Sequence, residues 1–144
     1  MKKILLSLTA LTAFAGATSA SSVTYIPADE VKAAFEKGTP LLEVANYKIH
    51  ASRREAAGQV EVHEKDTDII HVLSGTATFV TGGTVVGGKT VAPEEIRGTD
   101  VRGGETREIR AGDVIVVPNG TPHWFKAVPA PMTYYVVKVR AEGK

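Results

Sequence analysis

Residues 112–123 read G-D-V-I-V-V-P-N-G-T-P-H, and this stretch decides the fold. It begins with two turn-forming residues, Gly112 and Asp113, and continues with the apolar run 114–117, which has the length of a buried strand. Residues 118–120, Pro-Asn-Gly, form a second turn three residues before His123. The pattern of turn, short apolar strand and turn is typical of β-sandwiches and barrels, and here it directs a histidine toward the interior.

Short strands are expected on both sides of this stretch. From Leu41 onward, apolar and polar residues alternate with a period of two, as in half-buried strands. The expected strands are 42–44, 47–51, 60–63, 68–73, 76–81, 105–109, 114–117, 123–128 and 133–140. Helical patterns between these strands are absent, so the sequence predicts an all-β barrel or sandwich and not an α/β fold.

One stretch of this region does not fit a regular hairpin. Residues 82–104 contain several glycines and a proline among valine, threonine and charged residues. We expect a long ordered loop there, with one short strand at most. Such a loop either frames a binding site or forms a surface excursion or subunit contact.

Two segments precede the expected barrel of residues 41–140. Residues 1–20 have a positive start, an apolar stretch too short to span a bilayer comfortably, and small residues at the end, which predicts a signal peptide and an exported (periplasmic or secreted) protein. Residues 21–40 contain the one convincing helical pattern, from Ala28 to Lys37, between Pro27 and Gly38.

Composition excludes several classes of protein. The chain has 144 residues, 43% of them apolar, which suits one globular domain. Its formal charge of +1 and lack of a basic stripe argue against a nucleic-acid partner, and no membrane contact is expected after the signal is removed. The absence of cysteine rules out thiolate metal sites and cysteine nucleophiles, so any metal must be held by imidazole and carboxylate.

Strand parity sorts the residues that can carry chemistry. Successive side chains of a strand point to opposite faces, so Glu61 shares a face with His63. If these two, Asp68 and His123 all face inward, they form a cluster of two imidazoles and two carboxylates. Such a cluster can hold one divalent ion, Mn, Fe, Ni or Zn. The alternative is that the carboxylates are solvated and the imidazoles merely hydrogen-bonded at the barrel mouth.

Parity also assigns residues to the outside. His50 has the parity of Lys48 and is expected at the surface. In the last strand, Tyr135 and the valines two and four residues later are the expected inner set, so Lys138 is expected to point outward. The arginines at 53, 54, 97 and 102 are interpreted as solvated surface charge, with an anion site at the rim as the alternative.

The stretch 112–123 resembles the second sequence signature of the cupin superfamily. The segment ending at Gly75 resembles the first signature, with Asp68 in place of a glutamate, His63 as the second histidine and Glu61 in place of the first. An alternative registration takes His63 as the first histidine and puts Lys65 second. The resemblance implies a double-stranded β-helix, or jelly-roll, barrel with a short N-terminal helix, a metal site, and pairing as a homodimer.

Two classes of function follow from this resemblance. The first is a metal-dependent enzyme, such as a dioxygenase, isomerase or lyase, that acts on a small polar molecule; no catalytic residue beyond the metal ligands is assigned. The second is a non-catalytic module that binds a small ligand, such as a sugar or an organic acid, without a metal.

Overall fold

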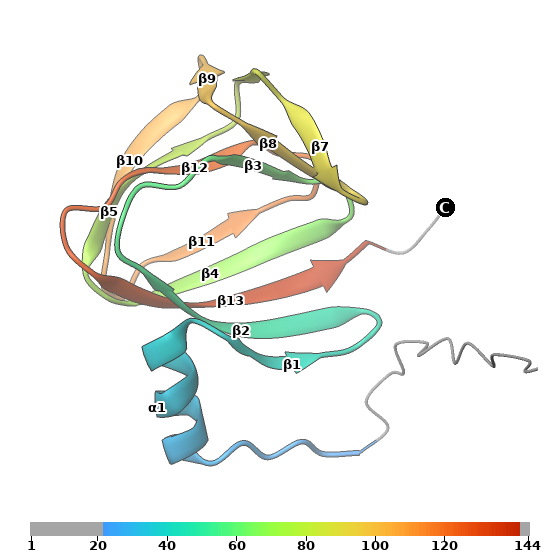
Figure 1. Ribbon diagram of the computed structural model, residues 1–144, viewed down its shortest axis with the longest axis vertical. Helices are drawn as coiled ribbons and strands as arrows, with labels where there is room; N and C mark the ends of the chain where they lie inside the picture. Colours follow the sequence, from blue (N-terminus) through green and yellow to red (C-terminus); the bar gives the residue numbers. More distant parts are fainter. Residues whose placement is uncertain (1–21, 142–144) are drawn as a thin grey trace, which may run out of the picture.

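The computed structural model describes residues 22–141, which form one helix and a series of antiparallel strands (Figure 1). The elements are α1 (Ala28–Lys37), β1 (Pro40–Glu43), β2 (Tyr47–Arg54), β3 (Val60–His63), β4 (Asp66–Ser74), β5 (Thr76–Thr81), β6 (Thr84–Val86), β7 (Lys89–Ala92), β8 (Glu95–Gly98), β9 (Asp100–Arg102), β10 (Glu105–Arg110), β11 (Val114–Val117), β12 (His123–Ala127) and β13 (Met132–Arg140). The expected signal peptide, residues 1–20, lies outside the described residues.

Two sheets make up the barrel. One has the strand order β1-β2-β13-β4-β11 and the other the order β10-β5-β12-β3-β8-β7, while β6 and β9 form a small separate pair. The two larger sheets face each other in Figure 1. The predicted all-β jelly-roll is therefore confirmed. The core between the sheets consists of Ile70, Val72, Ala77, Phe79, Ile109, Val117, Phe125, Met132, Tyr134 and Val136.

Two glycines close the turns on which the sequence pattern depends. Gly112 lies before β11 with φ +94°, and Gly75 joins β4 to β5 with φ +80°. Both values lie in the left-handed region that glycine adopts without strain. A Cβ at Gly75 would lie 2.6 Å from the Cβ of Met132, a fully buried residue, so this position also requires the absence of a side chain.

The helix covers the outer face of the first sheet. It ends as expected at Gly38, where the left-handed backbone lets the amide donate to Ala34 O at 2.8 Å. Phe35 packs edge-to-face against Tyr135 of β13, with ring centroids 4.9 Å apart. The expected parity of β13 is therefore wrong: Tyr135 faces the helix, while Lys138 faces the interior. The reason is that the helix buries the outer face too, so apolar side chains occur on both faces.

The same correction applies to β2. Lys48, His50, Ser52 and Arg54 all line the barrel cavity. The expected surface positions of His50 and Arg54 are therefore wrong. The apolar residues of β2, Ile49 and Ala51, occupy the opposite face, on the side of the strand that α1 covers.

Residues 82–104 are more regular than expected. They form four short strands, β6 to β9, in place of a loop with one strand at most. β8 pairs with β3, with Arg97 opposite Glu61. This pairing adds β8 to the wall of the cavity.

No helix within residues 22–141 has the length and apolar character needed to cross a membrane.

Candidate metal centre

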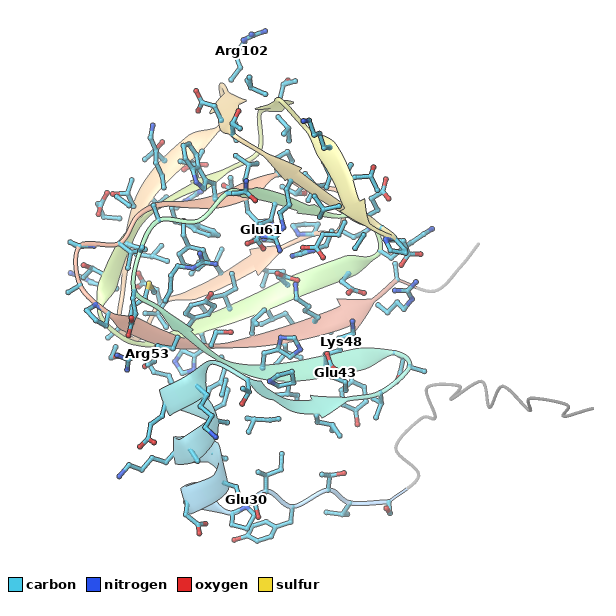
Figure 2. The ribbon with its side chains drawn as sticks, viewed as in Figure 1. Glu30, Glu43, Lys48, Arg53, Glu61 and Arg102 are labelled. Atoms are coloured by element: carbon cyan, nitrogen blue, oxygen red, sulfur yellow. The ribbon has the colours of Figure 1, made fainter. Side chains whose placement is uncertain are left out.

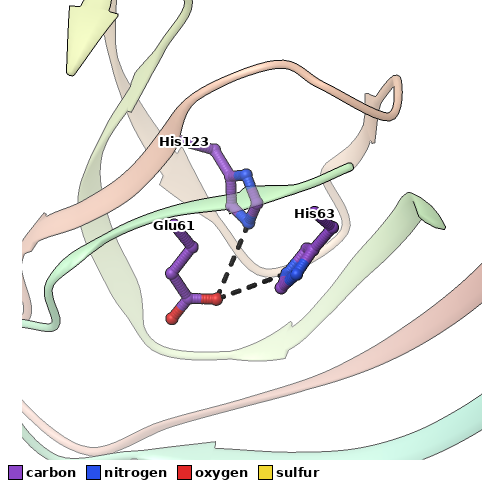
Figure 3. A group of neighbouring side chains, drawn as sticks. All are labelled: Glu61, His63 and His123. Carbon is purple, nitrogen blue, oxygen red and sulfur yellow. Dashed lines mark ion pairs between the residues drawn. The ribbon is translucent and has the colours of Figure 1, made fainter. Parts of the chain in front are cut away.

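Three side chains converge inside the barrel. Glu61 and His63 come from β3 and His123 from β12, and one donor atom of each lies within 4.8 Å of the others (Figure 3). Glu61 and His123 are direct partners across the two strands. The shared face of Glu61 and His63 is as strand parity predicts, and the condition that His123 also faces inward is met.

The turn before β12 fixes the histidines relative to each other. The Gly120 amide donates to His63 O at 2.7 Å, and Asn119 Nδ2 donates to Glu64 O at 3.1 Å. The turn is thereby tied to the end of β3. His123 Nδ1 lies 3.3 Å from Thr121 O, so we assign the ring proton to Nδ1. This hydrogen bond leaves the Nε2 lone pair directed toward Glu61, the orientation that metal-binding histidines require.

Asp68 lies beside both imidazoles but is held by another residue. Its Oδ2 is 3.4 Å from His63 Nε2 and 3.7 Å from His123 Nε2. Asp68 does not complete the group of three mutually close donors. Instead, Lys138 Nζ donates to both of its oxygens, at 2.7 and 2.8 Å. The structure thus brings all four expected residues together, and it pairs one of them with a lysine that the sequence interpretation placed outside.

The three converging residues fit a divalent ion. His63 Nε2 is buried and makes no hydrogen bond of good geometry among the described residues; its neighbours are the carboxylates of Asp68 and Glu61, at ion-pair distances of 3.4 and 3.5 Å. Glu61 Oε2 lies 3.5 Å from His63 Nε2 and 3.8 Å from His123 Nε2. Metal bonds of about 2.1 Å at tetrahedral angles separate donor atoms by about 3.4 Å, close to both Glu61–histidine separations, so an ion would draw together a set that now lies within 4.8 Å.

The surrounding charges hold the carboxylates ionised. Burial opposes charge on Glu61, but contact with His63 and the positive charge of Arg97 together lower its pKa to about 2. Burial likewise opposes charge on Asp68, and His63 and Lys138 lower its pKa. Both carboxylates are therefore available as anions at neutral pH.

The two imidazoles differ in their protonation. Burial opposes charge on His63, but the adjacent carboxylates of Asp68 and Glu61 raise its pKa to about 9. Burial is also the main influence on His123, and it lowers the pKa of that ring. At neutral pH His63 is therefore an imidazolium in the metal-free site, protonated on both ring nitrogens, while His123 is neutral with Nε2 unprotonated.

A cavity of about 340 Å³ adjoins this centre. Figure 2 shows Glu61 in the space between the sheets and Lys48 on the β2 side of it. The wall also contains Arg97, which pairs with Glu61 and Glu95, and Arg54, whose guanidinium carbon lies 4.5 Å from the centroid of the Phe125 ring. The expectation that Arg54 and Arg97 are solvated surface charge is therefore wrong, because strand pairing within 82–104 and the inward face of β2 are set by tertiary packing.

Comparison with known proteins gives the fold and the family. A solved protein of Bacillus halodurans is 15% identical, with 88% of this chain and 89% of that chain covered and a TM-score of 0.57. KdgF from Halomonas sp. is 17% identical, with coverages of 72% and 79% and a TM-score of 0.52. A protein of Klebsiella pneumoniae with a double-stranded β-helix domain is 15% identical, with coverages of 74% and 78% and a TM-score of 0.50.

At these identities the likeness shows the fold alone. No curated protein matches the chain. The family model described as "Cupin" matches residues 30–144, which is most of the sequence. The chain therefore belongs to the cupin family.

Proposed function

We propose that this protein binds one divalent metal ion through Glu61, His63 and His123 and acts on a small polar molecule in the barrel. The observation that carries the proposal is the convergence of three donors, among them the buried Nε2 of His63, which makes no hydrogen bond of good geometry in the described part of the chain. Two imidazoles and one carboxylate form the donor set of non-haem iron sites, and Mn, Ni and Zn also accept such ligands. Asp68 is the fourth candidate ligand.

Each residue around the centre has a distinct part in this proposal. The bound ion would supply a Lewis acid with open positions for substrate. Arg97 holds Glu61 through one carboxylate oxygen, which leaves Oε2 facing the imidazoles. The ammonium group of Lys138 is a proton donor that lies beside Asp68 at the cavity wall. Phe125 and Val136 line the cavity with apolar surface, which limits water around the reacting molecule.

A specific observation supports the second candidate, a binding module without metal. Glu61 pairs with Arg97, and Asp68 pairs with Lys138, so both carboxylates have a cationic partner even without an ion. Metal analysis separates the two candidates, and assays of turnover then separate a metal-binding enzyme from a metal-binding module.

The test is the metal content of protein purified without chelator and incubated in turn with Mn, Fe, Ni and Zn salts. We expect about one ion per chain for the natural sequence, and a loss of at least tenfold in affinity for His123→Ala and Glu61→Gln. His71→Ala is the matched control, because His71 is exposed on β4. If no salt gives stoichiometric metal, the metal-dependent proposal is wrong. If metal binds, oxygen uptake and turnover of small acids, sugars and phenols test for catalysis.

The proposal extends to the cellular location and the assembly of the chain. The pattern of residues 1–20 supports export, which cell fractionation and the mass of the mature N-terminus would test. The exposed side chains of Val114 and Val116 on β11 support pairing of two copies as a homodimer.

A further inference from the structure

The inward face of β2 consists of polar side chains. Lys48, His50, Ser52 and Arg54 all line the cavity, and we refer to these four residues as the β2 donor stripe. A strand that faces a barrel interior usually presents apolar residues there. The stripe contains no carboxylate, and each of its members can donate a hydrogen bond. This side of the cavity is therefore suited to a ligand with acceptor atoms.

Lys48 makes no ion pair among residues 22–141, since Glu43, its neighbour in the register on β1, pairs with His50. In the register of the sheet it lies directly opposite Lys138, which in turn lies opposite Asp68. Asp68 pairs with Lys138, and no carboxylate among residues 22–141 pairs with Lys48. Like charges directly opposite on neighbouring strands are destabilising. A bound anion would therefore relieve the repulsion between Lys48 and Lys138.

The Arg54 guanidinium is also incompletely satisfied. Its ion pair with Glu61 spans 3.7 Å, and its Nε donates to no acceptor in the described part of the chain. Phe125 supports the guanidinium plane from one side. Arg54 therefore retains donor capacity at the end of the stripe away from Lys48.

The acids around the cavity are already engaged. Asp66 pairs with Arg140, Glu95 with Arg97, and Asp68 with Lys138. His50 Nε2 lies 3.1 Å from Glu43 Oε1, so it is the one member of the stripe with a carboxylate at hydrogen-bond distance. Four cationic and four anionic side chains line the cavity, so the free positive charge is local and lies at Lys48, which makes no ion pair within residues 22–141. A divalent ion at the candidate metal centre would add positive charge to the same cavity.

We infer that the cavity takes a small anionic molecule, whose carboxylate or phosphate group binds Lys48 and the other residues of the β2 donor stripe. This inference rests on the proposed function for the orientation of the ligand, whose remaining part would face the metal centre. The anion contacts themselves need no ion, because they come from β2. The volume of about 340 Å³ limits the ligand to a small molecule.

Binding of simple anions to the full chain tests the inference. Malonate and inorganic phosphate are titrated calorimetrically into protein stripped of metal, with malonamide as the uncharged counterpart of malonate. We expect malonate or phosphate to bind and malonamide not to bind, and the tighter anion identifies the group. Lys48→Met should weaken anion binding at least tenfold, whereas Lys126→Met, which removes the same charge from the exposed end of β12, should not.

Two further measurements, thermal unfolding and metal content, distinguish loss of the anion site from misfolding and from loss of the metal. Lys48→Met without ligand should unfold at a temperature equal to or above that of the natural protein, because the repulsion from Lys138 is gone, so weaker binding cannot be attributed to misfolding. Metal content is measured on the same variants and should be unchanged. If neither anion binds, or if Lys48→Met binds as tightly as Lys126→Met, the inference is wrong whatever the metal result.

Discussion

At the scale of single residues, the proton on His63 leads to the first prediction. A histidine must be neutral to bind a metal, but the pKa of His63 is raised to about 9 in the metal-free site. Metal binding at pH 7.5 should therefore release about one proton per ion. Calorimetry in two buffers of different ionisation enthalpy measures this number. The matched control is the same titration at pH 9.5, where His63 is mostly neutral and the release should fall below half a proton.

The raised pKa of His63 also determines how the stability of the metal-free protein depends on pH. A pKa raised from 6.5 means that the contacts of His63 with Asp68 and Glu61 stabilise the metal-free protein fully below pH 6.5. This contribution is lost as the pH rises through about 9. Equal metal affinity and equal proton release at pH 7.5 and 9.5 would show that His63 is not protonated in the free site.

A second prediction at this scale concerns Lys138. Its ammonium group binds both oxygens of Asp68 and so keeps this carboxylate from completing the metal site. Lys138→Met should raise metal affinity about tenfold, because it frees a fourth ligand and removes a nearby positive charge. In the metal-free protein it should cost about 3 kcal/mol, since a buried carboxylate loses its partner. Competition with a chromogenic chelator and thermal unfolding measure the two effects.

Lys48→Met is the matched control for this variant. It removes a neighbouring cation from the same cavity but leaves Asp68 paired, so it should change metal affinity much less than Lys138→Met does. Equal affinities in the two variants would mean that the charge alone, and not the release of Asp68, governs the site.

The residues of the centre were partly predictable from sequence. Period-two alternation put Glu61 and His63 on one face of their strand, and the resemblance to the cupin signatures, rather than parity, pointed to Asp68 and His123 as their partners. Lys138 was missed because its strand has apolar residues on both faces, and parity cannot then decide which face is inside. Arg97 was missed because its contact with Glu61 depends on a strand pair that no local pattern indicates.

At the scale of the elements, the two turn glycines allow a matched test. Gly75 and Gly112 both have positive φ, but a Cβ would strike Met132 only at Gly75, and at Gly112 it meets open space. Gly112→Ala should lower the free energy of unfolding by about 1 to 2 kcal/mol through backbone strain alone. Gly75→Ala should cost about 2 kcal/mol more, because the added methyl group overpacks the core.

Urea denaturation measures both variants, as a shift in the midpoint at constant slope. Equal losses of stability would show that the contact with Met132 relaxes at no cost, and that backbone conformation alone makes glycine necessary at both turns.

The prediction of elements succeeded where one sequence pattern had one structural meaning. The strand 114–117 and the helix from Ala28 to Lys37 were predicted with the bounds that the structure has, because glycine or proline marks their ends. Residues 82–104 were underpredicted, since strands of three or four residues leave too little sequence for alternation to be seen. These short strands are stabilised by pairing with β3 and with one another.

At the scale of the whole molecule, β11 has one edge that pairs with no other strand of the described chain. It is an edge strand of its sheet and pairs only with β4 in the described chain. Val114 and Val116 on this strand are 62% and 58% exposed. Exposed apolar edge strands are rare in monomers, because their free backbone groups invite pairing with another chain. The edge is therefore the surface where the proposed homodimer would form.

The last prediction tests this edge. Light scattering after gel filtration should give a dimer for the natural sequence and a monomer for Val116→Lys, because a buried lysine would oppose association. Val91→Lys is the matched control, since Val91 is equally exposed, at 58%, on β7 of the other sheet. A monomeric natural protein, or a dimer that persists in Val116→Lys, would contradict pairing at β11. Because all three candidate ligands come from β3 and β12 of one chain, the monomeric variant should keep its metal, which makes assembly and metal binding separable.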